Sequence, residues 1–491
     1  CQQSLFSYLF FFLIYNITYT NMASNGTTDM ESIAIEENSP LIKNNNTTPT
    51  NNNNNNNGNI GNNILEKNKV SFHGTFLNLL KSSLGAGLLG FPFGFRKAGW
   101  LGGIISCLIL SCITGFGMHC LIITRQNISS VVKKSKKYSQ REYLEFIDIA
   151  FLASGTWARR AAWWGVVVGQ LGVCVSYAIF ITNNLHSSVF PAETFSRVVV
   201  VLFIFPILLV LSFVKTLKNL LPVAAAGLGL LFIGIIFIFS FGLSKSNRPA
   251  FPQKLPSLDV NGLVIMCGIS TFAMESITQI PSLQANMKQP KYFPTVLNLT
   301  IGTMLILYTL FGLFGSLMFG KKTESVITRN IPHTVTAGIG SRIALVLYIL
   351  CTYPFQMYPL AQTIDRTILG WMAPSSSSEK KKDDDPMRMN ASSTNQTLST
   401  MQYYSIRIVL VTTTVIVAIF AKDFGSFISL IGWSCTGTLG LVLPGYMMIK
   451  FNNGNDLSRF LYIACWLLFV SGIIMTISGT IGSILEIIHG E

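Results

Sequence analysis

A glycine-rich stretch inside an apolar segment is the first feature of the sequence that could do chemistry. It runs from Ser82 to Pro92, SSLGAGLLGFP, within an apolar segment that extends from Phe76 to Phe95. Glycines loosen a helix and proline removes a backbone donor, so a membrane-spanning helix is expected to break here. The half-helix that follows would offer N–H groups and a positive dipole end to a carboxylate. A close helix crossing through small residues is the alternative interpretation.

A second candidate is Glu275, an acidic residue inside another apolar segment. The stretch from Ser270 to Pro281, STFAMESITQIP, places this carboxylate close to a proline. Carboxylates within membrane spans are costly and commonly belong to ion or substrate pathways. Because buried carboxyl groups can titrate near neutral pH, Glu275 could bind and release a proton during function. A structural anchor, bonded to backbone N–H groups of a neighbouring helix, is the alternative that we keep open.

Other polar residues in apolar segments carry weaker signals. His119, near the cytosolic end of the second span, could relay protons or be a hydrogen-bonded histidine at the interface. Tyr177 and Tyr353 lie within spans, where tyrosines are usually packing or interfacial residues. We include Tyr177 among the candidate substrate-binding residues. The chain contains no HExxH, GxSxG, Walker or dinucleotide motif and no metal-ligand spacing. We therefore expect no enzyme activity, no catalytic residues, no cofactor and no metal.

The composition that surrounds these residues is typical of a multi-pass membrane protein. The 491 residues are 50% hydrophobic and 11% charged, whereas soluble domains carry about 25% charged residues. The net charge of +14 does not indicate nucleic-acid binding, because Lys and Arg gather in the cytosolic loops of membrane proteins. Eight of the nine cysteines lie in apolar segments, and we interpret them as small apolar residues.

Hydropathy predicts eleven transmembrane spans that would position the two candidate sites. They cover about 76–97, 100–123, 162–185, 196–214, 219–243, 259–283, 294–319, 338–362, 403–421, 424–449 and 459–487. The two interruptions fall in the first and sixth spans. Five spans is the offset expected when two five-span halves form an inverted repeat.

The segments between and before the spans predict the orientation of the chain. Eight Lys and Arg residues gather between Arg125 and Arg160, which places that loop and the N-terminus in the cytosol.

Residues 138–160 form an amphipathic segment that we expect to lie along the interface. Residues 1–70 are predicted to be a disordered cytosolic tail and 373–400 a disordered cytosolic loop, with the transmembrane domain spanning 71–487. Met22 could be the true start, which would leave 1–21 outside the mature protein.

The predicted tail carries a candidate sorting signal. Glu37 lies four residues before the pair Leu41 and Ile42, the spacing of an acidic dileucine signal read by a sorting adaptor. Its position in a polar tail before the first span favours this interpretation over coincidence.

Several stretches together resemble the transmembrane amino acid transporter family, also called the amino acid/auxin permeases. They are NLLKSSLGAGLLGFPFGFRKAGWLGG, QLGVCVSYAIFITNNL, FAMESITQIPSLQANMKQPKYFP and ISLIGWSCTGTLGLVLPGYM. The resemblance covers about residues 72–487 and is greatest to the proton-coupled and vacuolar amino acid transporters. It implies an all-α, eleven-span LeuT-type fold with an inverted five-plus-five repeat and broken helices 1 and 6.

The resemblance also implies roles for individual residues. It assigns substrate binding to the two unwound spans, at Ser83, Gly85, Ala86, Gly87, Phe272, Ala273 and Met274. Where the family often has Phe-x-Phe-Glu-Gly, this chain has Met274 and Ser276, which leaves its side-chain selectivity open. Asn78 stands where proton-coupled animal members often have a histidine, so the resemblance does not support proton coupling through that position. Glu275, as an acidic residue inside a span, is our candidate for proton coupling.

We therefore expect a secondary active transporter of small neutral amino acids, coupled to protons. We place it in an endolysosomal or vacuolar membrane rather than the plasma membrane. The alternative is an amino-acid sensor at the endolysosomal membrane with little transport. The expected partners are small neutral amino acids, protons, membrane lipids and a sorting adaptor, with no nucleic acid.

Overall fold

The computed structural model describes residues 69–134, 144–186, 196–214, 217–244, 253–332, 334–372, 399–421, 423–451 and 459–489. Every helix described below lies in one compact unit that begins at Val70. The predicted sorting signal at Glu37, Leu41 and Ile42 lies outside the described residues. Residues 373–398 of the predicted cytosolic loop also lie outside the described residues.

Long helices form most of this unit. The uninterrupted ones are α5 (Trp100–Lys134), α7 (Arg197–Ser212), α8 (Leu217–Leu243), α11 (Phe293–Phe319), α12 (Thr336–Met372), α14 (Thr400–Phe420) and α17 (Arg459–His489). Within the described residues, nine helical stretches are long and apolar enough to cross a membrane. The remaining two predicted spans are the fourth, α7, which has 16 residues, and the first, which is divided in two. The expectation of a multi-pass all-α protein is confirmed.

Both predicted interruptions are present. The first span consists of α3 (Phe72–Ser83) and α4 (Gly87–Ala98), with extended backbone at Leu84 between them. The sixth consists of α9 (Val260–Ala273) and α10 (Ile280–Ala285), which are joined through a short 3-10 turn at Ile277–Gln279. The first span breaks because its glycines loosen the helix. The sixth breaks at a polar stretch that is followed by Pro281.

A third irregular span was not anticipated from the sequence. Here α15 (Phe424–Ile431) and α16 (Leu443–Phe451) are joined by two π-helical turns, Gly432–Thr436 and Thr438–Val442. Such wide turns occur often at functional sites because they displace side chains and backbone from the regular helical pattern.

The third span is bent where it leaves the predicted interface segment. Helix α6 (Phe146–His186) includes Gly155, whose φ of 81° lies in the left-handed region that favours glycine. The helical turns before this bend bury Phe146, Ile149 and Ala150. The helix therefore changes direction at Gly155, seven residues before the predicted span 162–185 begins.

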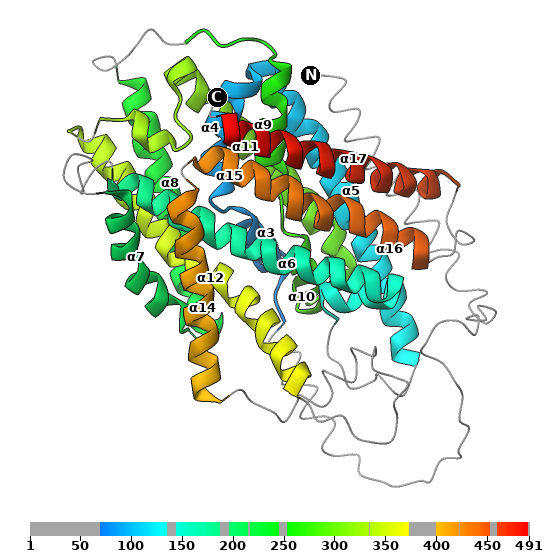
Figure 1. Ribbon diagram of the computed structural model, residues 1–491. Helices are drawn as coiled ribbons and strands as arrows, with labels where there is room; N and C mark the ends of the chain where they lie inside the picture. Colours follow the sequence, from blue (N-terminus) through cyan, green and yellow to red (C-terminus); the bar gives the residue numbers. More distant parts are fainter. Residues whose placement is uncertain are drawn as a thin grey trace, which may run out of the picture. The chain divides into compact units, whose positions relative to one another are not determined.

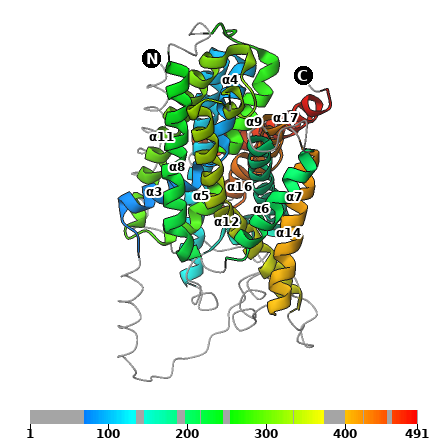
Figure 2. The ribbon, with the colours of Figure 1, turned by 90° about the vertical axis from the view of Figure 1, so that its left-hand side faces the viewer.

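The broken helices lie next to each other. Helix α4 packs against α9 and α11 (Figures 1 and 2), and α15 packs against α9 (Figure 1). Helix α12 runs along α8, while α7 packs against α14 (Figure 1). The two interruptions are thus brought together by the contact between the first and sixth spans.

The chain enters α3 through a pairing with the end of the sixth span. The N–H of Val70 donates to the carbonyl of Asn286 at 2.8 Å, and the N–H of Lys288 donates to the carbonyl of Val70 at 2.9 Å. Ser71 then caps α3 by accepting from the N–H of Gly74. Val70, the last residue of the predicted tail, is therefore part of the folded unit.

Candidate functional site

Tyr308 joins the two interruptions through a single hydroxyl group. This residue lies on α11 and is fully buried. Its hydroxyl is 2.9 Å from the carbonyl oxygen of Ser83, at the end of α3, and 3.1 Å from that of Ala273, at the end of α9. Its ring stacks on Phe91 of α4 with 4.7 Å between ring centroids. The last carbonyls of two broken helices therefore converge on one atom.

Two more tyrosines bind the backbone of the first interruption. The hydroxyl of Tyr348 on α12 donates to the carbonyl oxygen of Leu84 at 2.7 Å. The hydroxyl of Tyr177 on α6 interacts with the backbone N–H of Ala86. A Cβ atom placed on Gly85 would lie 3.4 Å from this same hydroxyl. Tyr177, which we expected to bind substrate, thus faces the unwound stretch.

Gly87 sets the distance between the first and sixth spans. A Cβ atom at this position would lie 2.7 Å from both Cα and Cβ of Ala273 and 3.2 Å from the ring of Phe272. Real Cβ atoms do not approach other carbons so closely, and no side chain fits here without moving a helix. Five predicted substrate-binding residues besides Tyr177 therefore meet around this contact: Gly85, Ala86, Gly87, Phe272 and Ala273.

Ser83 takes part in the site through its backbone. Its hydroxyl donates to the carbonyl of Leu79 one turn earlier at 2.9 Å, while its own carbonyl accepts from Tyr308. The carbonyl, and not the side chain, is the group of Ser83 that is presented to the interruption.

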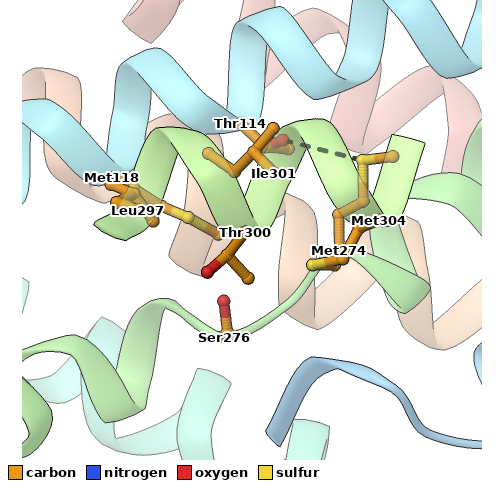
Figure 3. Close-up of a pocket in the computed structure, with 8 residues that line it drawn as sticks. All are labelled: Thr114, Met118, Met274, Ser276, Leu297, Thr300, Ile301 and Met304. Carbon is orange, nitrogen blue, oxygen red and sulfur yellow. Dashed lines mark hydrogen bonds between the residues drawn. The ribbon is translucent and has the colours of Figure 1, made fainter. Parts of the chain in front are cut away.

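Met274 points to the other side of the sixth span. Its sulfur accepts a hydrogen bond from Ser111 on α5 at 3.3 Å and lies 4.0 Å from the hydroxyl of Thr114 (Figure 3). Met274 and Thr114 border a cavity of about 10 Å³, room for about one water molecule. Its lining residues are Thr114, Met118, Met274, Ser276, Leu297, Thr300, Ile301 and Met304. Met274 is thus separated from the contact at Gly85 and Gly87.

Glu275 lies at a third location, facing the irregular tenth span. It is half-buried, and its carboxylate accepts a hydrogen bond from Thr278 at 3.2 Å. The short turn that follows it, Ile277–Gln279, packs against the second π-helical turn, Thr438–Val442. The bond to Thr278 stays within its own segment and differs from the anchor to a neighbouring helix that we considered. Glu275 therefore stands between the sixth and tenth spans.

The tenth span is held against α9 at short range. Trp433 donates from its indole nitrogen to the carbonyl of Val264 at 2.9 Å. A Cβ atom on Gly432 would lie 2.0 Å from the carbonyl oxygen of Gly268, so the two backbones touch. The π-helical turns beside Glu275 are thus packed directly on the sixth span.

His119 forms a hydrogen bond between helices. Its Nε2 atom lies 2.7 Å from the amide oxygen of Asn298, which joins α5 to α11.

The sequence did not single out Tyr308 or Tyr348 as site residues. The only available signal was a tyrosine in the middle of an apolar span, because a buried hydroxyl usually finds a hydrogen-bond partner. That signal does not identify the partner.

Among the described residues, no group of three or more His, Cys, Asp or Glu side chains could hold a metal ion.

Comparison with known proteins identifies the family. The family model described as "Transmembrane amino acid transporter protein" matches residues 68–485. The chain belongs to this family. It is a multi-pass membrane protein of amino acid transport and not an enzyme.

Relatives match this transporter over most of its length. The amino acid transporter ANT1 of Arabidopsis thaliana is 27% identical over 382 residues, which cover 75% of this chain and 82% of the relative. The proton-coupled amino acid transporter-like protein pathetic of Drosophila melanogaster is 26% identical over 388 residues, 75% of each chain.

The fold is shared with a solved transporter structure. The inward-facing conformation of Mhp1 matches 86% of this transporter and 90% of that chain, with a TM-score of 0.50 and 12% identity. This likeness confirms the LeuT-type fold predicted from the sequence.

Proposed function

We propose that the protein is a secondary active transporter that moves small neutral amino acids together with protons. The convergence of the Ser83 and Ala273 carbonyls at the joined interruptions carries this proposal. Helix C-termini attract positive charge and the N–H groups at a helix start attract negative charge. An α-ammonium group would be recognised by these carbonyls, and a carboxylate by N–H groups near Ala86.

The surroundings of the interruption favour a small, uncharged side chain. The side chains closest to Gly85 and Gly87 are Tyr177, Phe272 and Ala273, which bring aromatic and methyl groups and no formal charge. A charged substrate side chain placed among them would lack a partner of opposite charge, which is unfavourable in apolar surroundings.

Glu275 supplies a group for proton coupling. It directly precedes the turn of the sixth span that packs on the π-helical tenth span, so a change in its charge would alter this packing. The Drosophila relative is named as a proton-coupled amino acid transporter-like protein, which supports protons as the coupled ion.

We further propose that the transporter resides in an endolysosomal or vacuolar membrane. Glu37, Leu41 and Ile42 would form an acidic dileucine signal for a sorting adaptor in a cytosolic tail.

Transport by purified protein in proteoliposomes tests the proposed function. A panel of labelled small neutral, acidic and basic amino acids is offered with and without an imposed pH gradient. We expect uptake of a small neutral member that is stimulated by the gradient and abolished by a protonophore. Measurable binding without flux of any member would instead support the sensor alternative, and gradient-independent flux would remove protons from the mechanism.

A further inference from the structure

The hydroxyl of Tyr308 is shared by more acceptors than it can fully satisfy. A tyrosine hydroxyl has one hydrogen to donate, yet the carbonyl oxygens of Ser83 and Ala273 both lie within 2.9–3.1 Å of it. Both carbonyls belong to the last turns of helices, where no further N–H group of the same helix is available. A ligand with several donor hydrogens would therefore satisfy this pair better than the phenol does.

The hydroxyl groups around the first interruption are arranged like the ammonium and carboxylate groups of an amino acid. Hydroxyl donors from Tyr308 and Tyr348 meet the carbonyls of Ser83 and Leu84. The oxygen of Tyr177, in contrast, meets the N–H of Ala86. Donors thus lie at the carbonyls, where an ammonium group would bind, and an oxygen lies at the N–H, where a carboxylate would bind.

We propose that Tyr308 is a positioning residue that holds the ends of α3 and α9 together until the substrate ammonium takes over their carbonyls. The inference rests on the proposed function, since it assumes that an amino acid binds at this interruption. An ammonium group carries three hydrogens and a positive charge, so it binds two helix-end carbonyls more strongly than a neutral hydroxyl does. Tyr308 competes with the substrate for these carbonyls and stabilises the closed arrangement of the interruptions between transport events.

The variant Tyr308→Phe tests whether the hydroxyl competes with the substrate for the two carbonyls or only stabilises the fold. The phenylalanine ring keeps the stacking on Phe91 but removes the hydroxyl. Without its competitor the substrate should bind more tightly, by about fivefold for the loss of one neutral hydrogen bond. When no substrate is bound, both carbonyls would then lack a hydrogen-bond donor. The return of the empty transporter across the membrane, which requires the ends of α3 and α9 to stay together, should therefore slow. We expect substrate exchange to be retained while net uptake falls.

The matched control is Tyr353→Phe. Tyr353 is also fully buried and lies on α12, but its hydroxyl faces Thr414 of α14. This variant loses a buried hydroxyl away from the interruptions, and its affinity and its ratio of exchange to net uptake should stay at the wild-type values. Thermal unfolding of each variant in detergent reports any general loss of stability.

The experiment measures equilibrium binding, exchange and net uptake in parallel. The probe is labelled L-alanine, or the panel member that the wild-type protein takes up fastest. Weaker or unchanged binding in Tyr308→Phe, or a parallel fall in exchange and net uptake, would overturn the inference. Wild-type protein that neither binds nor exchanges any panel member would instead refute the proposed function, on which the inference depends.

A less invasive measurement covers the case in which Tyr308→Phe does not fold. Meta-fluorotyrosine is placed at position 308 of the full chain, and its fluorine NMR signal is followed as the same amino acid is added. The resonance should shift as the hydroxyl leaves the two carbonyls, while the same label at position 353 should not respond. A resonance at 308 that stays unchanged at saturating substrate would contradict the displacement.

Discussion

Arg407 on α14 donates hydrogen bonds to both carboxylate oxygens of Asp365 on α12, each at 2.6 Å. The side chains are only 7% and 17% exposed, and the guanidinium stacks on the ring of Tyr403 at 3.7 Å from its centroid. Two-point pairs of this kind fix direction as well as distance. The pair therefore sets how the end of the eighth span meets the ninth.

The two residues that follow Asp365 attach the same helix end to the third span. Arg366 forms an ion pair with Glu145, directly before α6. Thr367 accepts a hydrogen bond from the indole nitrogen of Trp163 on α6 at 2.9 Å. Consecutive residues of α12 thus hold two neighbouring helices.

Asp365→Asn should destabilise the protein strongly. It leaves the buried guanidinium of Arg407 without its counter-charge, and breaking such a pair costs about 3–5 kcal/mol. Thermal unfolding in detergent should show a lowered midpoint. The control is Glu324→Gln, whose pair with Arg329 is 3.8 Å long and exposed by 48% and 43%, so its loss should have little effect. Equal midpoints for the two variants would show that the buried pair does not stabilise the helix packing.

Gly87→Ala should impair binding of substrate. The added methyl group would meet Ala273 at 2.7 Å, which forces the first and sixth spans apart. Overpacking of this kind costs about 1–3 kcal/mol and would separate the carbonyls of Ser83 and Ala273. Gly302→Ala on α11 is the control, because no atom lies within 4 Å of a Cβ atom there. Wild-type affinity in Gly87→Ala, measured by equilibrium binding, would argue against substrate recognition at this contact.

Glu275→Gln should separate transport from its driving force. Glutamine keeps the size and an acceptor for Thr278 but does not titrate. We expect the variant to bind and exchange substrate while uptake no longer responds to a pH gradient in proteoliposomes. Glu324→Gln serves as a control for loss of one carboxylate from the exposed surface. Full gradient-driven uptake by Glu275→Gln would assign proton coupling to another group and favour a structural role for Glu275.

Replacement of Leu41 and Ile42 by Ala should move the protein to the cell surface. An adaptor that reads the acidic dileucine signal would no longer bind, while the membrane domain from Val70 onward would be unaltered. Surface biotinylation and compartment staining measure the shift, with Asn51→Ala in the polar tail as the control. Unchanged compartment staining of the double variant would reduce the motif to coincidence.

The sequence by itself determined the multi-pass all-α architecture, the class of protein and the places where the first and sixth spans break. These features depend on local chemistry: apolar length, the conformational freedom of Gly85 and Gly87, and an acidic residue followed by Pro281. They are encoded in neighbouring residues, and the structure reproduces them as α3–α4 and α9–α10.

Only the tertiary structure decided which groups meet at those breaks. Tyr308 lies 225 residues from Ser83 in sequence, yet its hydroxyl joins that carbonyl to Ala273. Met274 and Glu275 are adjacent in sequence, but Met274 accepts a hydrogen bond from Ser111 of α5, whereas Glu275 accepts one from Thr278 of its own segment. Where a chain unwinds, the helical period no longer predicts the direction of side chains. Packing against α5, α11 and the π-helical turns then sets those directions.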